Sequence, residues 1–217
     1  MRNDKNQFGN LTELQLDALQ EVGNIGAGHA AIGLTQFLNR STYMSIPNVA
    51  LDNLQAISRL VKMPGDQDVA IISLHTISDL LYTLLVFFNG ESVRKIIKLM
   101  TVTTSVDSED LYDISPLFLS LIKETGSILL LKYVEALNYF LKANSFPSPP
   151  RLRIGTIASL TQNELKDVIQ NLSTVLVIEC DIFTSAKSIA IDLVIVPRLE
   201  TFDQFMQKLF SKDTEDY

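Results

Sequence analysis

Apolar residues along the chain alternate between a helical period and short continuous runs, which predict helices and buried strands. They return every three or four residues from Leu11 to about Leu38, as on one face of a long helix. Val69 to Leu74 and Leu80 to Phe88 are apolar runs joined by a short polar link, which is typical of a hairpin. The first half is therefore predicted to be helix, strand, helix, strand, strand, helix, over residues 11–38, 43–46, 51–61, 69–74, 80–88 and 91–100.

The same order of elements begins again after a polar, acidic stretch at residues 101–113. Ser115 can cap a second long helix whose first position is Pro116, where the missing N–H costs nothing. The elements predicted for this half cover residues 116–142, 151–157, 162–171, 174–182, 189–196 and 199–210. We interpret the chain as two pseudo-repeats, about 10–101 and 114–210, with a linker at 101–113 and a short polar tail at 211–217.

The repeat predicts how the strands combine. Each copy is small for a core of its own and has an odd number of strands, so the two sets are best joined in one sheet. We expect an α+β fold in which a pseudo-two-fold duplicated α-β-α-β-β-α unit makes residues 1–217 a single domain. One continuous sheet would carry the two long helices on one face. The alternative, two independent domains on a flexible linker, is disfavoured because residues 101–113 contain no glycine or proline.

Composition narrows the class of protein. The 217 residues are 47% hydrophobic and 20% charged, enough to bury a core. The net charge of -7 would repel a phosphate backbone, so we expect no nucleic-acid partner. The longest apolar stretch, Leu80 to Phe88, is far shorter than the roughly 20 residues of a membrane span, so we expect no membrane insertion. A polar N-terminus and a single cysteine, Cys180, predict a cytosolic protein.

Candidate chemistry lies on the first long helix. At about 100° per residue, Asp17, Glu21 and Asn24 fall within about 60° of one another, and Gly28 continues the stripe one turn later. A polar stripe alone is equally typical of a solvated helix face. Glycines at positions 23, 26, 28 and 33 are unusual, because each lowers helix stability by about 1 kcal/mol relative to alanine. Some other interaction must compensate for that loss.

The glycines suggest two different uses. Gly26 and Gly33 lie on the packed side of the helix, where we expect close approach to a sheet, whereas Gly28 on the polar stripe leaves room for another molecule. The run from Gly23 to Gly28 is not a dinucleotide fingerprint, because the glycine order is wrong and no strand precedes it.

The same residues carry a family resemblance. Asp17, Glu21 and Asn24, followed after 22 residues by Pro47, resemble the motif of the CheC, CheX and FliY phosphatases of bacterial chemotaxis. The run from Glu21 to Ala30 is similar to the CheC form almost letter for letter. The duplicated layout and the length of the chain also resemble CheC, whereas CheX resembles a single, shorter unit.

The resemblance implies dephosphorylation of the response regulator CheY, which carries its phosphate on an aspartate beside a bound Mg²⁺. An acyl phosphate with its metal in place needs little beyond an aligned water, which fits a sequence without a metal-binding cluster. By the family's pattern Asn24 would hold the attacking water, and Glu21 would meet the regulator's active-site lysine. Asp17 and Gly28 would make docking contacts, and Pro47 would fix the chain after the first strand. No metal or cofactor of its own is implied, since the Mg²⁺ belongs to the partner.

The second long helix departs from the motif. Ser120, Glu124, Ser127 and Pro150 keep the intervals, but the decisive asparagine is replaced by Ser127. Its hydroxyl is about two heavy atoms shorter than a carboxamide and cannot donate and accept through separate groups. Leu131 stands where the first copy has Gly28, so we expect it on the docking stripe. We interpret this copy as a degenerate site retained for the fold.

Two other functions stay open from the sequence alone. The first is a non-catalytic adaptor that uses the same helices to hold CheY or the deamidase CheD, which CheC proteins bind. The second is a structural subunit of a larger assembly, which would need exposed apolar residues. Intact Glu21 and Asn24 favour the phosphatase over both.

Overall fold

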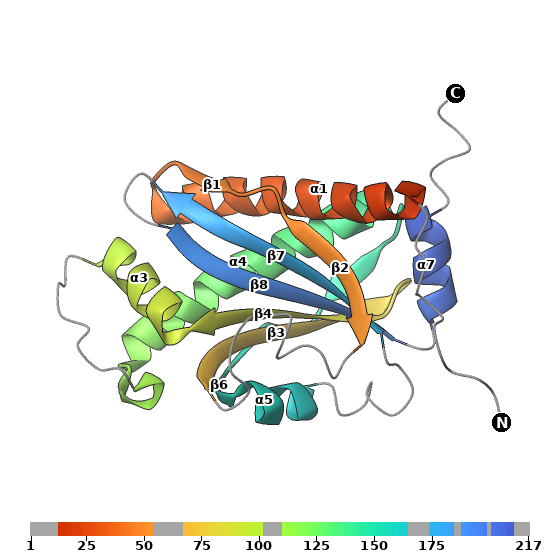
Figure 1. The fold of residues 1–217 in the computed structure, drawn as a ribbon. Helices are drawn as coiled ribbons and strands as arrows, with labels where there is room; N and C mark the ends of the chain where they lie inside the picture. The colour runs from red at the N-terminus through yellow and green to blue at the C-terminus, as the bar shows by residue number, and fades with distance from the viewer. Residues whose placement is uncertain are drawn as a thin grey trace.

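The chain folds around one antiparallel sheet with helices packed on its faces, as the computed structural model in Figure 1 shows. The structure describes residues 13–53, 67–101, 110–164, 174–184, 188–198 and 201–210. This mixed architecture confirms the predicted α+β class. Much of the predicted linker and all of the predicted polar tail fall outside the described residues.

Most elements predicted for the first half are present. They are α1 (Glu13–Leu38), β1 (Thr42–Met44), β2 (Asn48–Asn53), β3 (Asp68–Ser78), β4 (Tyr82–Asn89) and α3 (Gly90–Met100). The helix predicted over residues 51–61 is wrong at its start, because Leu51 to Asn53 belong to β2 and pair with β7 (Thr174–Thr184). The remaining positions, 54–61, lie outside the described residues. Residues 51–53 are extended because they pair with a strand that is distant in the sequence. The local pattern of apolar residues contains no information about such a partner.

The second half follows a similar order after a short 3-10 helix, η2 (Leu111–Asp113). Its elements are α4 (Pro116–Phe140), β5 (Ser145–Pro147), β6 (Arg151–Thr156), α5 (Ile157–Glu164), β7, β8 (Ser188–Pro197) and α7 (Phe202–Phe210). Ser115 caps α4 as predicted, accepting a hydrogen bond from the Phe118 N–H. The helix predicted at residues 162–171 begins earlier, because β6 passes directly into α5 and the Thr156 hydroxyl accepts the Ser159 N–H at 3.3 Å.

The strands form a single sheet that joins both halves of the chain. Eight strands lie in the order β1-β7-β8-β4-β3-β5, with β2 beside β7 and β6 beside β3. One strand from each half meets at the centre, where β4 pairs with β8 from Tyr82 opposite Pro197 to Phe87 opposite Asp192. The short outer strands of each half pair with the long hairpin of the other half. The predicted continuous sheet is confirmed, and the common origin of the two halves stays a prediction.

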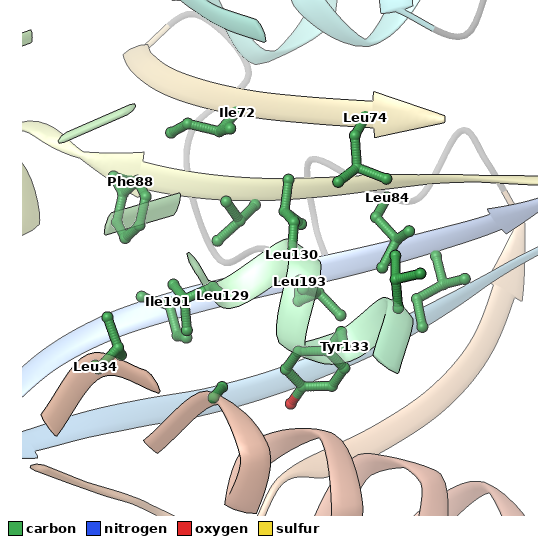
Figure 2. Close-up of a cluster of buried hydrophobic side chains, with 14 of the residues drawn as sticks. Leu34, Ile72, Leu74, Leu84, Phe88, Leu129, Leu130, Tyr133, Ile191 and Leu193 are labelled. Carbon is green, nitrogen blue, oxygen red and sulfur yellow. The ribbon is translucent and has the colours of Figure 1, made fainter. Parts of the chain in front are cut away.

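The two long helices lie together on one face of the sheet (Figure 1). Figure 2 shows the core between these helices and the sheet. Leu34 of α1 and Leu129, Leu130 and Tyr133 of α4 lie among side chains of the sheet. The sheet contributes Ile72, Leu74, Leu84, Phe88, Ile191 and Leu193. These residues are all buried, so the position of α1 on the molecule is fixed by apolar packing along its inner side.

The central strands are buried on both faces. In β3, Ile72 belongs to the core beneath α1 and α4, and its neighbour Ile71 is equally buried although it points to the other side. On that other side lies α5, since a Cβ at Gly155, which is paired with Val69, would touch Leu160. Burial of both faces explains why these strands were continuous apolar runs in the sequence instead of alternating ones.

Candidate functional site

The exposed residues of helix α1 form a narrow ridge. Among its residues whose side chains are described, the exposed ones are Glu13, Asp17, Glu21, Asn24, Gly28, Ile32 and Gln36. They recur every three or four positions, which places them one above another along the helix. We call this set the α1 ridge. Four of the predicted site residues, Asp17, Glu21, Asn24 and Gly28, all lie on it, as their spacing predicted.

The remainder of α1 is turned inward. Val22, Ala30 and Leu34 are at most 1% exposed and belong to the hydrophobic core. Since these residues anchor the inner side, Glu21 and Asn24 are held outward by the rotation of the helix. Among the described residues, neither side chain has a hydrogen-bond or ion-pair partner. The carboxylate and the carboxamide are therefore both free to meet another molecule.

Two glycines of α1 serve packing, but against a helix and not against the sheet. A Cβ at Gly26 would overlap the ring of Tyr133 on α4, and a Cβ at Gly33 would lie 2.9 Å from Ile128 Cγ2 on the same helix. The expectation that they approach the sheet is wrong. That role belongs to Gly126 of α4, where an added Cβ would lie 2.7 Å from Ile72 Cγ1. The two long helices are in direct contact, so small residues are needed between them.

Gly28 has a different environment. A Cβ built at this position would have no atom within 4 Å, so the fold does not require glycine there. Glycine still lowers helix stability by about 1 kcal/mol relative to alanine. The gap it leaves on the α1 ridge lies directly after Asn24 along the exposed stripe, which agrees with the predicted use of Gly28 toward a partner.

Pro47 is buried and is tied to α1 by a residue that the sequence analysis did not identify. Gln20 Nε2 donates a hydrogen bond to the Pro47 carbonyl oxygen at 2.9 Å. At the other end of the segment, the Thr42 N–H donates to Thr35 Oγ1 at 3.0 Å. Residues 42–47 therefore run back along α1, held to it at both ends. Gln20 directly precedes Glu21, so its hydrogen bond attaches Pro47 to the part of α1 that carries the motif.

The counterpart positions on α4 are not equivalent. Ser127 is only 7% exposed, and its hydroxyl donates to the Lys123 carbonyl oxygen at 2.6 Å. Glu124 and Ser120 are exposed, and the Ser120 hydroxyl donates to the Pro116 carbonyl oxygen at 3.0 Å. Pro150 is half-buried just before β6. The structure thus places Ser120, Glu124 and Ser127 on one helix, but it directs Ser127, the counterpart of Asn24, inward.

Leu131 was expected to stand on the exposed docking stripe of α4, but it is not freely exposed there. It is half-buried and packs against the hydrophobic core. Its neighbours on α4, Ile128 and Lys132, lie against α1 at Gly33. Part of the Leu131 side chain is used in packing and is not available to a partner.

The α1 ridge lies apart from the pocket found among the described residues. A polar depression of about 680 Å³ lies at the start of α3, and its lining includes Asn89, Glu91 and Arg94 but no residue of the ridge. In that lining, a hydrogen bond from Lys95 at 2.7 Å lowers the pKa of Glu91. Within the described ranges, no group of three or more His, Cys, Asp or Glu side chains could hold a metal ion. An open helical ridge suits contact with a protein surface better than enclosure of a small molecule.

The sequence is similar to known chemotaxis proteins. A CheC-like family model matches residues 14–50, the segment that holds most of α1 together with Pro47. The chain is also 27% identical to the CheY-P phosphatase CheC of Bacillus subtilis over 210 residues, which make up 93% of this chain and 97% of that protein. No helix among the described residues is long and apolar enough to cross a membrane.

Solved structures share the fold. FliY from Thermotoga maritima matches with a TM-score of 0.72 and 21% identity, covering 93% of this chain and 98% of that chain. CheX in complex with CheY, BeF3 and Mg²⁺ from Borrelia burgdorferi matches with a TM-score of 0.51 and 13% identity, covering 81% of this chain and 96% of that chain. At these identities the likeness concerns the fold alone. The sequence matches confirm the resemblance to the CheC-like family that the motif on α1 predicted.

Proposed function

We propose that this protein is a phosphatase that accelerates hydrolysis of the aspartyl phosphate of a CheY-type response regulator, with its working site on α1. The observation that carries the proposal is the joint exposure of Glu21 and Asn24 on one ridge, without partners among the described residues. The naming of the Bacillus subtilis relative as a CheY-P phosphatase supports the activity. The CheX–CheY complex supports a regulator of this kind as the partner.

The reaction needs little from the phosphatase. A water attacks the phosphorus, the bond from phosphorus to the aspartate oxygen breaks, and inorganic phosphate leaves while the aspartate regains its carboxylate. The Mg²⁺ of the regulator stabilises the charge on the phosphoryl oxygens. What remains is to hold the water in line, and the Asn24 carboxamide can accept a hydrogen bond from it through one atom and donate through another.

Glu21 would orient the complex. It lies one turn before Asn24 on the α1 ridge, so its carboxylate can reach the active-site lysine of the regulator while Asn24 reaches the phosphoryl group. A charged contact of this kind speeds encounter and fixes the register of docking. Asp17, one further turn away, would add a peripheral contact. The reaction would take place in the cytosol, with phosphorylated CheY as substrate.

The alternative is a non-catalytic adaptor that holds CheY or CheD. It is supported by the state of α4, where Glu124 is exposed but Ser127 is turned inward and bonded to its own helix. Such a surface could still bind a partner without aligning a water. Phosphatase and adaptor differ in one measurable respect, since only a phosphatase shortens the lifetime of the phosphorylated regulator.

The deciding experiment is the decay of phosphorylated CheY with and without this protein. The amount of labelled phosphate that remains on the aspartate of CheY is followed over time. Catalytic amounts of this protein should speed its loss. The Asn24→Ala variant serves as the matched control on the same fold. Binding of CheY or CheD with no change in the rate of decay would support the adaptor and overturn the phosphatase.

A further inference from the structure

The α1 ridge changes character along its length. Its first half carries the carboxylates Glu13, Asp17 and Glu21, and its second half carries Ile32, whose side chain is 61% exposed. Ile32 is the apolar member of the ridge, one helical turn beyond Gly28. Single exposed apolar residues are ordinary on protein surfaces, so exposure by itself indicates nothing.

Asn24, Gly28 and Ile32 are successive members of the ridge. Four residues of helix rise about 6 Å, so Asn24 and Ile32 stand about 12 Å apart with bare backbone between them at Gly28. A Cβ at Gly28 would have no atom within 4 Å, so the described chain leaves open space at this position. A partner surface that approaches Asn24 closely along the helix therefore reaches the Ile32 side chain next.

We propose that Ile32 contacts apolar surface of the regulator beside its phosphorylation site and so strengthens docking on the α1 ridge. The inference rests on the proposed phosphatase function, and it adds a docking residue to that site. The partner that Ile32 would contact is phosphorylated CheY, because Ile32 lies on the same ridge as Glu21 and Asn24. The acidic end would meet the regulator's lysine, and the apolar end would remove hydrophobic surface from water.

Ile32 and Glu21 would contribute differently to binding. An apolar contact is insensitive to added salt at moderate ionic strength, whereas the attraction between exposed charges weakens as salt is added, with a Debye length of about 10 Å at 0.1 M. Loss of Ile32 should weaken docking equally at low and high salt. Loss of the Glu21 charge should weaken docking mainly at low salt. The salt dependence of the two variants therefore separates the two ends of the ridge.

The test compares Ile32→Ser with Ile77→Ser. Ile77 is a matched control, because it is 55% exposed and lies on β3, paired with β5 at the opposite edge of the sheet from β1. For wild type and both variants, kcat and KM are measured for hydrolysis of phosphorylated CheY at two salt concentrations. We expect Ile32→Ser to raise KM about tenfold with kcat little changed, and Ile77→Ser to behave as wild type. Ile32→Leu should restore most of the affinity.

Several results would overturn the role of Ile32. One is an unchanged KM for Ile32→Ser, and another is an equal rise for Ile77→Ser. A dimeric wild type that becomes monomeric in Ile32→Ser, with KM unaffected, would assign this face to contact between copies of the chain. If wild type does not accelerate phosphate loss, the proposed function fails by itself. Binding of BeF3-activated CheY to wild type and to Ile32→Ser then tests the apolar contact separately, and equal affinities reject it.

Discussion

For single residues, the proposed site rests on two exposed side chains that have no hydrogen-bond or ion-pair partner among the described residues. Glu21 and Asn24 are exposed, while residues next to them in the sequence, such as Val22 and Gly23, are buried. Removal of either functional group should therefore leave the fold intact, since neither group makes a hydrogen bond or an ion pair within the described part of the chain. Changes in activity can then be interpreted as effects on the reaction.

Asn24→Ala should abolish most of the acceleration of phosphate loss. Loss of one preorganised polar group that acts in the transition state lowers a rate on the order of 100-fold. Alanine also favours the helix over asparagine, so the thermal midpoint should not fall. The measurement is the rate of phosphate loss from CheY under saturating conditions, together with a thermal melt. A variant that retains the wild-type rate on an intact fold would show that Asn24 does not align the water.

Glu21→Gln should weaken productive docking and reduce the salt dependence of the activity. The substitution keeps the shape of the side chain but removes the charge expected to meet the regulator's lysine. The effect should appear in kcat/KM at low salt and become small at high salt, where exposed charges are screened. Equal values for the variant and wild type at both salt concentrations would contradict the charged contact.

At the scale of elements, the two long helices differ because they use small residues differently. On α1, Gly26 and Gly33 let α4 approach, and Gly28 keeps a gap on the exposed side. On α4, Gly126 faces β3 and Ser127 is buried beside it. One helix therefore presents a free ridge, and the other is packed over the corresponding stretch.

Alanine at two glycines of α1 should have opposite effects on stability. At Gly28 the new methyl group meets nothing, so Gly28→Ala should raise the free energy of unfolding by about 1 kcal/mol through helix propensity. At Gly26 it overlaps the ring of Tyr133, and overpacking of this kind costs about 1–3 kcal/mol. Denaturant unfolding of both variants measures the difference. Similar stability changes for the two would show that the contact between α1 and α4 is looser than described.

Ser127→Asn should not create a second working site. In an Asn24→Ala background any activity must come from α4, where position 127 is buried and its hydroxyl already donates to Lys123. A longer carboxamide placed there lacks room and should destabilise the protein by about 1–3 kcal/mol. Leu131→Gly added to it removes core packing and should lower stability further. Phosphatase activity near the wild-type level in either variant would mean that α4 can expose this position.

At the scale of the whole molecule, the two halves are held together through their central strands. Tyr82 begins β4 at the pairing with β8 and packs edge-on against Phe205 of α7, with ring centroids 5.8 Å apart. It is fully buried, and its hydroxyl has no hydrogen-bond partner among the described residues. Burial disfavours the charged form, so it raises the pKa of Tyr82 above the ordinary value.

The raised pKa predicts an alkaline loss of stability that depends on Tyr82. The folded protein keeps this phenol protonated, whereas the unfolded chain releases its proton above a pH of about 10. Stability from Tyr82 is therefore complete below that pH and declines as pH rises, by at most about 1.4 kcal/mol per pH unit. Tyr82→Phe should unfold with a shallower dependence between pH 9 and 11, and it should be no less stable at pH 7. Identical pH profiles for the two proteins would refute the link.

Much of the site could be predicted because it depends on local geometry. The helical period puts Asp17, Glu21, Asn24 and Gly28 on one stripe whatever surrounds the helix, and the structure finds all four exposed. The Ser115 cap and the β3–β4 hairpin were equally local. In contrast, the use of Gln20 was not foreseen, because its partner is the carbonyl of Pro47, which lies far along the chain and is brought near only by the fold.

The long helices, the apolar strands and the stripe that carries the candidate chemistry could be predicted, because each follows from the periodicity of neighbouring residues. The contacts that each residue makes depended on the tertiary fold. It placed α4 instead of the sheet against Gly26 and Gly33, made residues 51–53 part of β2, and turned Ser127 inward. These outcomes depend on contacts between segments distant in the sequence, whose free energies no local pattern contains.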